Sequence, residues 1–389
     1  MTTLRGRIGF EIELIAPPGV DRGVLARRVA IASGGAARRV FHTDSEPSLV
    51  PGMGHFWHLT PAWEVTDALG APVAYFVDDV TIAEDLRREQ ATAPGTAARD
   101  PRGTDLYRVL SDDPRLLRLV ARHSHPEAPF ARSLDEVARL VGTTVETVGA
   151  VRRLRDGAGA SIAMAAPLAL GRERPCEIVT APLTTDHETA LEALLRPARE
   201  LGFTVPVESA VHLHVDGAPF RSAHAFSNLV RLFGHWREAL HVLLETNPAC
   251  TRLAPLPPAL LALVETDPLL ELTPSGSDSD SGSGPGPGTG RGGDAHDRRW
   301  HRLQQAAAGT GPVKYADVNL TALLTDAPVR DTVEVRILPG SLDASTITER
   351  AGLVERLLDR CLEEAPFPSP TDAGDPARTA IELRRLADA

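Results

Sequence analysis

Lysine and cysteine are scarce in this chain, and each scarcity argues against a class of protein. Lys314 is the single lysine among 389 residues, and 52 acidic against 41 basic side chains give a net charge of −11. Attraction to nucleic-acid phosphates needs local positive charge, so we expect no general nucleic-acid binding. The three cysteines form no Cys-x-x-Cys pair and no recognisable disulfide framework, which fits a reducing compartment.

Long apolar runs are missing as well. No stretch approaches the ~20 consecutive apolar residues of a membrane span, and no apolar run follows a basic start at the N-terminus. Hydrophobic residues still make up 42% of the chain, enough for a sizeable core. We therefore expect a globular, cytoplasmic protein that does not bind membranes. No Gly-rich Walker loop occurs, so a phosphate would be bound in another way.

One tract has almost no apolar material. Residues 274–294 are mainly Ser, Gly, Pro and Asp, without a large apolar side chain. Such a segment cannot bury enough surface to offset the entropy lost on ordering, which predicts a disordered insertion. A linker between two domains is the alternative. Polar motifs on both sides of the tract favour one site, and hence a single domain over 1–389.

The hydrophobic periodicity predicts a mixture of helices and strands. Apolar positions recurring every three or four residues predict helices over 21–33, 186–201, 222–246, 344–364 and 376–387. Two-residue alternation predicts strands over 7–15, 62–67, 73–77, 176–181, 209–216, 315–320 and 332–338. Because strands and helices do not alternate as regular βαβ units, we expect the α+β class with a mainly antiparallel sheet.

The segment 134–148 is typical of two short helices joined at Gly142. Acidic and basic residues nearly balance over 134–155. A helix that reads DNA would need more basic residues, so a plain helical hairpin is the favoured interpretation.

Several predicted strands carry charged side chains at alternate positions, which places those side chains on one face. In chain order these polar positions are Glu11 and Glu13, Glu177, His212 and His214, and Glu334 and Arg336. Solvated charges on separate amphipathic strands would explain each strand alone. If the strands are neighbours in one sheet, its polar face instead gathers carboxylates, imidazoles and a guanidinium.

That combination indicates a particular chemistry. Carboxylates are the ligands preferred by Mg²⁺ and Mn²⁺, and Mn²⁺ also tolerates imidazole. An arginine beside such metals can pair with a phosphate that bridges them. The polar face therefore predicts a nucleotide-dependent phosphoryl-transfer site.

The order of these motifs resembles a known family. The matching segments are Gly9-Phe10-Glu11-Ile12-Glu13, Glu177-Ile178-Val179-Thr180-Ala181-Pro182-Leu183, Val211-His212-Leu213-His214-Val215, Asn319-Leu320 and Glu334-Val335-Arg336-Ile337. They resemble the amidoligase family, part of the carboxylate–amine ligase superfamily of glutamine synthetase and glutamate–cysteine ligase. The resemblance implies a glutamine-synthetase-like antiparallel sheet curved around a funnel, with helices on its outer side.

The resemblance also implies ATP-dependent amide formation through an acyl phosphate, with Mg²⁺ or Mn²⁺. Glu13 and Glu177 would hold one metal ion. Glu11, His212 and Glu334 would hold another.

Four further residues are candidates for binding and catalysis. The resemblance implies that His214 lies near the nucleotide phosphates, that Arg336 contacts the transferred phosphoryl group and that Asn319 orients a substrate. Lys314, the lone lysine, offers a compact ammonium suited to phosphate, although its survival by chance is an equal alternative.

The acid or base that serves the amine is harder to locate. Asp44 with Ser48, and the pair Asp78-Asp79, are candidates, with a plain turn role as the alternative.

The sequence does not identify the substrates. Glutamine synthetase carries glycine and serine before its histidines, where this chain has Glu208-Ser209-Ala210-Val211, and its glutamate-holding loop is not recognisable. A peptide, a cell-wall component or a small amine would fit the family. Superfamily members often form rings or dimers, which leaves a homo-oligomer open. A guanidino-kinase-like phosphotransferase and a non-catalytic binding protein are the competing hypotheses.

Overall fold

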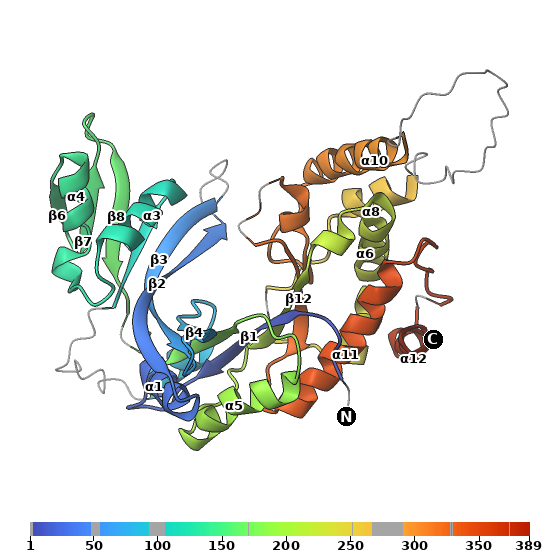
Figure 1. Ribbon diagram of the computed structural model, residues 1–389, viewed down its shortest axis with the longest axis horizontal. Coiled ribbons are helices and arrows are strands. Elements are labelled where there is room, and N and C mark those ends of the chain that lie inside the picture. The colour runs from blue at the N-terminus through green and yellow to red at the C-terminus, as the bar shows by residue number, and fades with distance from the viewer. Residues whose placement is uncertain are drawn as a thin grey trace. The chain divides into compact units, whose positions relative to one another are not determined.

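The computed structural model describes residues 3–47, 55–92, 106–169, 171–250, 252–266, 291–326, 328, 330–372 and 374–389. The chain packs into two compact units (Figure 1). The first unit comprises Met1–Phe10, Pro182–Ala190 and Ala210–Ala389, and the second comprises Glu11–Ala181 and Leu191–Ser209. The division falls inside strand β1 (Ile8–Ile15) and inside helix α5 (His187–Glu200), so each of these elements contributes to both units.

The second unit is built on an antiparallel sheet. Its hydrogen-bonded order is β1, β9 (Pro175–Thr180), β4 (Pro72–Val77), β3 (His55–Thr66), β5 (Tyr107–Ser111), β8 (Ser161–Pro167), β7 (Val151–Arg155) and β6 (Val145–Val148). Strand β2 (Ala36–Pro47) also pairs with β3 along its whole length. Tight turns join β3 to β4 and β7 to β8, each pair running antiparallel.

Four helices complete this unit: α1 (Arg22–Ala32), α2 (Glu84–Thr92), α3 (Pro114–His123) and α4 (Asp135–Val141). Helix α1 begins at Arg22 because the Asp21 side chain accepts a hydrogen bond from the backbone N–H of Val24 (2.8 Å). Helices α3 and α4 bury Leu117 and Val137 against Tyr107 of β5. These contacts form an apolar core under the β5–β8–β7 part of the sheet.

The predicted helical hairpin over 134–148 is half wrong. Helix α4 ends at Gly142, which takes a left-handed conformation with φ of 71°. The residues after it form β6, which pairs antiparallel with β7. Val145, Thr147 and Val148 are all β-branched, so this stretch suits a strand better than a second helix.

The first unit pairs β11 (Val318–Asn319), β12 (Thr332–Pro339) and β10 (Ala210–Asp216) in that order, all antiparallel. Its helices are α6 (Ala223–His235), α7 (Arg237–Leu244), α8 (Pro258–Thr266), α10 (Arg291–Ala308), α11 (Ala344–Cys361) and α12 (Pro376–Asp388). Val335 and Ile337 of β12 pack into an apolar cluster with Leu240 of α7 and Leu357 of α11. The helices thus cover the apolar face of β12 and leave Glu334 and Arg336 on the other face.

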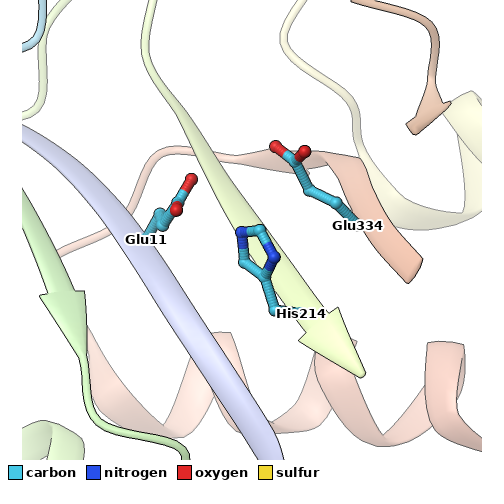
Figure 2. Close-up of side chains that lie close together, drawn as sticks. All are labelled: Glu11, His214 and Glu334. Carbon is cyan, nitrogen blue, oxygen red and sulfur yellow. The ribbon is translucent and has the colours of Figure 1, made fainter. Parts of the chain in front are cut away.

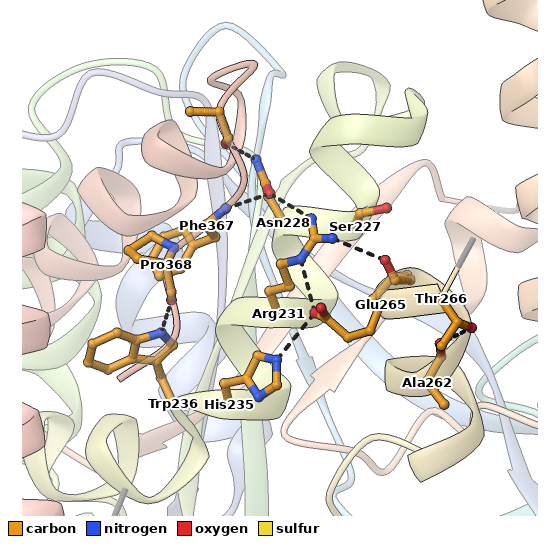
Figure 3. Close-up of polar contacts among 12 residues, drawn as sticks. Ser227, Asn228, Arg231, His235, Trp236, Ala262, Glu265, Thr266, Phe367 and Pro368 are labelled. Carbon is orange, nitrogen blue, oxygen red and sulfur yellow. Dashed lines mark hydrogen bonds and ion pairs between the residues drawn. The ribbon is translucent and has the colours of Figure 1, made fainter. Parts of the chain in front are cut away.

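The helix predicted over 222–246 is two helices, α6 and α7, because Trp236 between them leaves the helical conformation (φ −102°, ψ 13°). Its buried indole N–H donates to the carbonyl of Pro368 (2.7 Å) (Figure 3). On α6, Asn228 accepts from the N–H of Phe367 (2.8 Å) and donates to the carbonyl of Ala365 (3.0 Å). These bonds fasten the segment after α11 to α6.

Two boundary predictions are changed by the structure. Of the tract expected to be disordered, residues 274–290 lie outside the described residues, whereas Arg291–Asp294 belong to α10. Of the strand expected over 315–320, Val318–Asn319 pairs with Val335 and Glu334 of β12, and Ala316 forms an isolated bridge with Ala254. The α+β class and the mainly antiparallel pairing are confirmed. Among the described helices, none combines the length and apolar character needed to cross a bilayer.

Candidate active site

The second unit brings together the acidic residues of β1 and β9. Glu13 lies directly opposite Glu177 in the antiparallel register, and Glu11 is two positions along the same face of β1. The neighbouring pair Ile12 and Ile178 is fully buried on the opposite face. The alternation in the sequence therefore correctly separates the apolar from the acidic positions of β1.

Electrostatics show how crowded this acidic face is. Burial raises the pKa of Glu177 well above 4.5, and the negative charges of Glu11, Asp79, Glu13 and Asp44 raise it further. A carboxylate among like charges is stabilised either by a proton or by a cation. The face can therefore bind a hard divalent cation, whose charge would replace the proton.

The structure distinguishes among the aspartates proposed for the amine side. Asp44, on β2, contributes to the electrostatic field at Glu177 although it is distant in sequence. Asp78 is enclosed and pairs with Arg172 (2.6 Å), which gives it a structural role. Asp79 accepts hydrogen bonds from the N–H (2.7 Å) and hydroxyl (2.9 Å) of Thr81, and its charge also acts on Glu177. Ser48 lies outside the described residues.

The first unit places its polar candidates in a row across three strands. His214 of β10 lies opposite Glu334 of β12, and Glu334 lies opposite Asn319 of β11. Figure 2 shows the His214 and Glu334 side chains on neighbouring strands. Asn319 donates a hydrogen bond of 2.8 Å to Oε2 of Glu334. The Nδ1 of His214 is 3.2 Å from the hydroxyl of Thr332.

Glu334 is the centre of this row. Its Oε1 accepts a hydrogen bond from Arg336 and lies 3.5 Å from Nδ1 of His212. Glu334, Arg336 and His212 are all buried, with 7%, 8% and 4% of their surface exposed. His212 shares this face with His214 because the two are two positions apart on β10. A register shift between Val211 and Leu213 leaves two β12 residues opposite His212.

The described residues thus carry the expected motifs. A comparison with known families shows which family the chain belongs to. Residues 5–256 match the family described as "Putative amidoligase enzyme". The chain belongs to the amidoligase family. No curated protein and no solved structure matches it. The family match includes Glu11, Glu13, Asp44, Glu177, His212 and His214 and ends before Lys314, Asn319, Glu334 and Arg336.

In the first unit of this amidoligase, three basic side chains surround the ring of Tyr315, and the sequence analysis identified two of them. The guanidinium of Arg336 lies 5.6 Å from the ring centroid of Tyr315, and the ammonium of Lys314 lies 5.0 Å from it. Arg252 lies over the same ring at 5.0 Å. Three cations around one aromatic ring form a region that attracts phosphate oxygens. The sequence analysis found Lys314 and Arg336 but missed Arg252 and Tyr315, for which no local pattern exists.

The buried carboxylate of Asp317 fixes the segment that carries part of this cationic group. Asp317 is 1% exposed and contacts Nε2 of His241 and Nε of Arg237, each at 2.8 Å. Its backbone carbonyl accepts from the N–H of Arg336 (3.0 Å). Asp317 therefore holds the segment that carries Lys314, Tyr315 and Asn319 against β12, and removing its charge would leave Arg237 without its buried carboxylate partner.

Proposed function

We propose that this amidoligase is an ATP- and Mg²⁺-dependent carboxylate–amine ligase. The observation that carries the proposal is the Glu13–Glu177 pair with Glu11 beside it, because clustered carboxylates suit a divalent cation. The histidine, glutamate and arginine row of the first unit adds imidazole and phosphate-binding groups. A single catalytic domain over 1–389, with a glutamine-synthetase-like curved sheet, is part of the proposal.

The donor set fits Mg²⁺ or Mn²⁺. In the second unit, Glu11, Glu13 and Glu177 offer carboxylate ligand atoms. In the first unit, His212, His214 and Glu334 offer imidazole and carboxylate ligand atoms. Bound metal would supply charge neutralisation for the ATP phosphates.

The chain's own residues then have definite tasks. A substrate carboxylate oxygen attacks the γ-phosphorus of ATP, ADP leaves, and an acyl phosphate results. Arg336 and Lys314 balance the charge of the transferred phosphoryl group. The amine nitrogen next attacks the acyl carbon, inorganic phosphate leaves, and Asp44 accepts the amine proton. Asn319 keeps Glu334 oriented through its hydrogen bond. The acyl acceptor is a small amine, a peptide or a cell-wall component.

Thermal unfolding tests the proposal without knowledge of the substrate. ATP or ADP with Mg²⁺ or Mn²⁺ is expected to raise the melting temperature, because a ligand selective for the folded state stabilises it. Glu334→Gln is expected to lose this metal-dependent shift, whereas Glu265→Gln, on the α8 side of the same unit, keeps it. No shift with either metal at millimolar nucleotide would overturn the proposal.

Hydroxylamine trapping tests the reaction itself. With ATP and a panel of carboxylates, an active ligase yields a hydroxamate from the acyl phosphate. A stable phosphorylated product without hydroxamate would indicate a phosphotransferase instead.

A further inference from the structure

The second unit contains a pocket of about 270 Å³ beside the start of α1. Its charged lining comprises Arg22, Arg27, Arg39, Glu127, Glu173 and Asp21, with the indole of Trp63 between them. These residues come from α1, β2, β3 and three connecting segments. The pocket is large enough for a small metabolite.

The pocket is on the opposite face of the sheet from the acidic site. Trp63 pairs with Phe76 across β3 and β4, Phe76 pairs with Ile178 across β4 and β9, and Ile178 pairs with Ile12 of β1. Directly paired residues share a face, and Ile12 alternates with Glu13. Trp63 therefore points away from the face that carries Glu13, and the pocket is a separate site.

Two guanidinium groups in the pocket are held by Trp63 and not by a carboxylate. The Cζ atoms of Arg27 and Arg39 lie 5.1 and 5.0 Å from the indole centroid. Within the part of the chain that the structure describes, neither side chain makes an ion pair or a hydrogen bond. Burial, followed by the positive charge of Arg22, lowers the pKa of Arg39 to about 10. A negatively charged ligand would offset both the cost of burying the Arg39 charge and its repulsion from Arg22.

Arg22 adds a donor that lacks an acceptor. It is 2% exposed, and its Nη1 donates to the carbonyls of Pro175 (3.0 Å) and Arg172 (2.5 Å) and lies 3.9 Å from Oδ1 of Asp78. Its Nε is enclosed and has no hydrogen-bond partner among the described residues. An enclosed N–H without an acceptor costs free energy, which a ligand oxygen would recover.

The same pocket also contains negative charge. Glu127 and Glu173 line it, and neither side chain forms a direct ion pair with another described residue. Leu106 and Pro126 provide apolar surface next to these charges. The charge of Glu127 acts favourably on Arg39 across the pocket without a direct contact, an arrangement that matches a ligand carrying both signs itself.

We propose that this pocket binds a free α-amino acid with an apolar side chain. The carboxylate lies at Arg39 and Arg22, where a guanidinium fork can hold both oxygens. The ammonium lies at Glu127 and Glu173, and the side chain lies against Leu106 and Pro126. Because the pocket is separate from the acidic face, this site is independent of the proposed ligase reaction, and its test needs neither ATP nor metal.

Isothermal titration of the full chain with L-leucine, 4-methylpentanoate and L-leucinamide tests the proposal. The second compound lacks the ammonium and the third lacks the carboxylate. L-Leucine is expected to bind at least about tenfold more tightly than either analogue, since each leaves one charged set unpaired. Equal binding of 4-methylpentanoate would overturn the zwitterion assignment. No heat change with L-leucine, L-valine or L-phenylalanine at millimolar concentration would overturn the site.

Variants separate the pocket from a general effect on folding. Arg39→Gln is expected to weaken L-leucine binding about tenfold, and Arg39→Lys to restore part of it. Arg28→Gln is the matched control, because Arg28 is on the same helix and pairs with Glu200 (3.3 Å) outside the pocket. Unchanged affinity in Arg39→Gln would contradict the proposal.

Gly23→Ala tests the pocket without changing charge. A Cβ at Gly23 would lie 2.6 Å from Nε1 of Trp63, so the indole and the two arginines on it must move. Leucine affinity is expected to fall although circular dichroism shows a folded chain. Retained affinity in this variant would contradict a site built around Trp63.

Discussion

Glu13 and Glu177 lie directly opposite each other on the antiparallel strands β1 and β9. Glu13 is only 4% exposed, and the pKa of Glu177 is raised by burial and by the surrounding carboxylates. Two carboxylates in this position repel each other when both are ionised. The pair costs stability in the metal-free chain, which is typical of residues retained for binding.

Glu177→Gln is therefore expected to stabilise the metal-free chain, by about 1 kcal/mol, because a like charge disappears from a buried face. The same change should abolish stabilisation by Mg²⁺ or Mn²⁺. Thermal unfolding with EDTA and with each metal measures both effects. Glu192→Gln, an exposed position on α5, is the control. A Glu177→Gln chain that is less stable in EDTA yet still responds to metal would contradict this account.

The cationic group around Tyr315 makes a separate prediction. Arg252→Gln is expected to weaken nucleotide binding about tenfold, because one of the charges available to phosphate is lost. Metal binding without nucleotide should be unchanged. Arg360→Gln, an exposed residue of α11 that pairs with Glu363, is the control. Nucleotide affinity equal to that of the control would exclude Arg252 from the phosphate region.

The pH dependence of stability can be tested at Glu64. Burial acts to raise its pKa, but hydrogen bonds from Tyr75 (2.7 Å) and Arg38 outweigh it and lower the pKa below 4.5. A lowered carboxyl pKa stabilises the folded chain above the unfolded pKa, and this stability is lost as the pH falls through the folded value. Tyr75→Phe is expected to cost about 2 kcal/mol at pH 7.

Urea unfolding between pH 3 and pH 7 measures this difference. The cost of Tyr75→Phe should shrink as the pH falls below about 4.5. In a Glu64→Gln background the same substitution should show little pH dependence. A cost that is constant with pH in both backgrounds would show that the Tyr75 hydroxyl acts through another contact.

Asn228 makes the last prediction. It is 1% exposed and satisfies the carbonyls of Glu363 and Ala365 and the N–H of Phe367 (Figure 3). Asn228→Leu is expected to cost about 3 kcal/mol, because these backbone groups lose their partner inside the protein.

The neighbouring Ser227→Ala is the control for Asn228→Leu. Among the described residues, the Ser227 hydroxyl bonds only to the carbonyl of Ala223 within the same helix, so its loss should cost less than about 1 kcal/mol. Chemical denaturation compares the two variants, and equal costs would contradict the role assigned to Asn228.

Local sequence patterns correctly predicted the features that backbone geometry determines, such as the face of a strand on which a side chain lies. The alternation in 332–338 correctly separated Val335 and Ile337, which face the helices, from Glu334 and Arg336. The helix predicted over 21–33 is α1 to within one residue at each end, and its Asp21 side chain caps the backbone N–H three residues away. The break at Trp236 was missed, since the indole's hydrogen bond to Pro368 is a long-range contact.

What the sequence by itself determined is the set of chemical groups and the face of each strand on which they lie, because side chains alternate with a period of two. Tertiary structure alone decided which groups meet. It set Glu177 against Glu13, enclosed Asp78 with Arg172 while Asp44 acts on Glu177, and brought Arg252 to Tyr315. It also placed two arginines on Trp63. Such contacts depend on strand register and packing between distant segments, which no local pattern encodes.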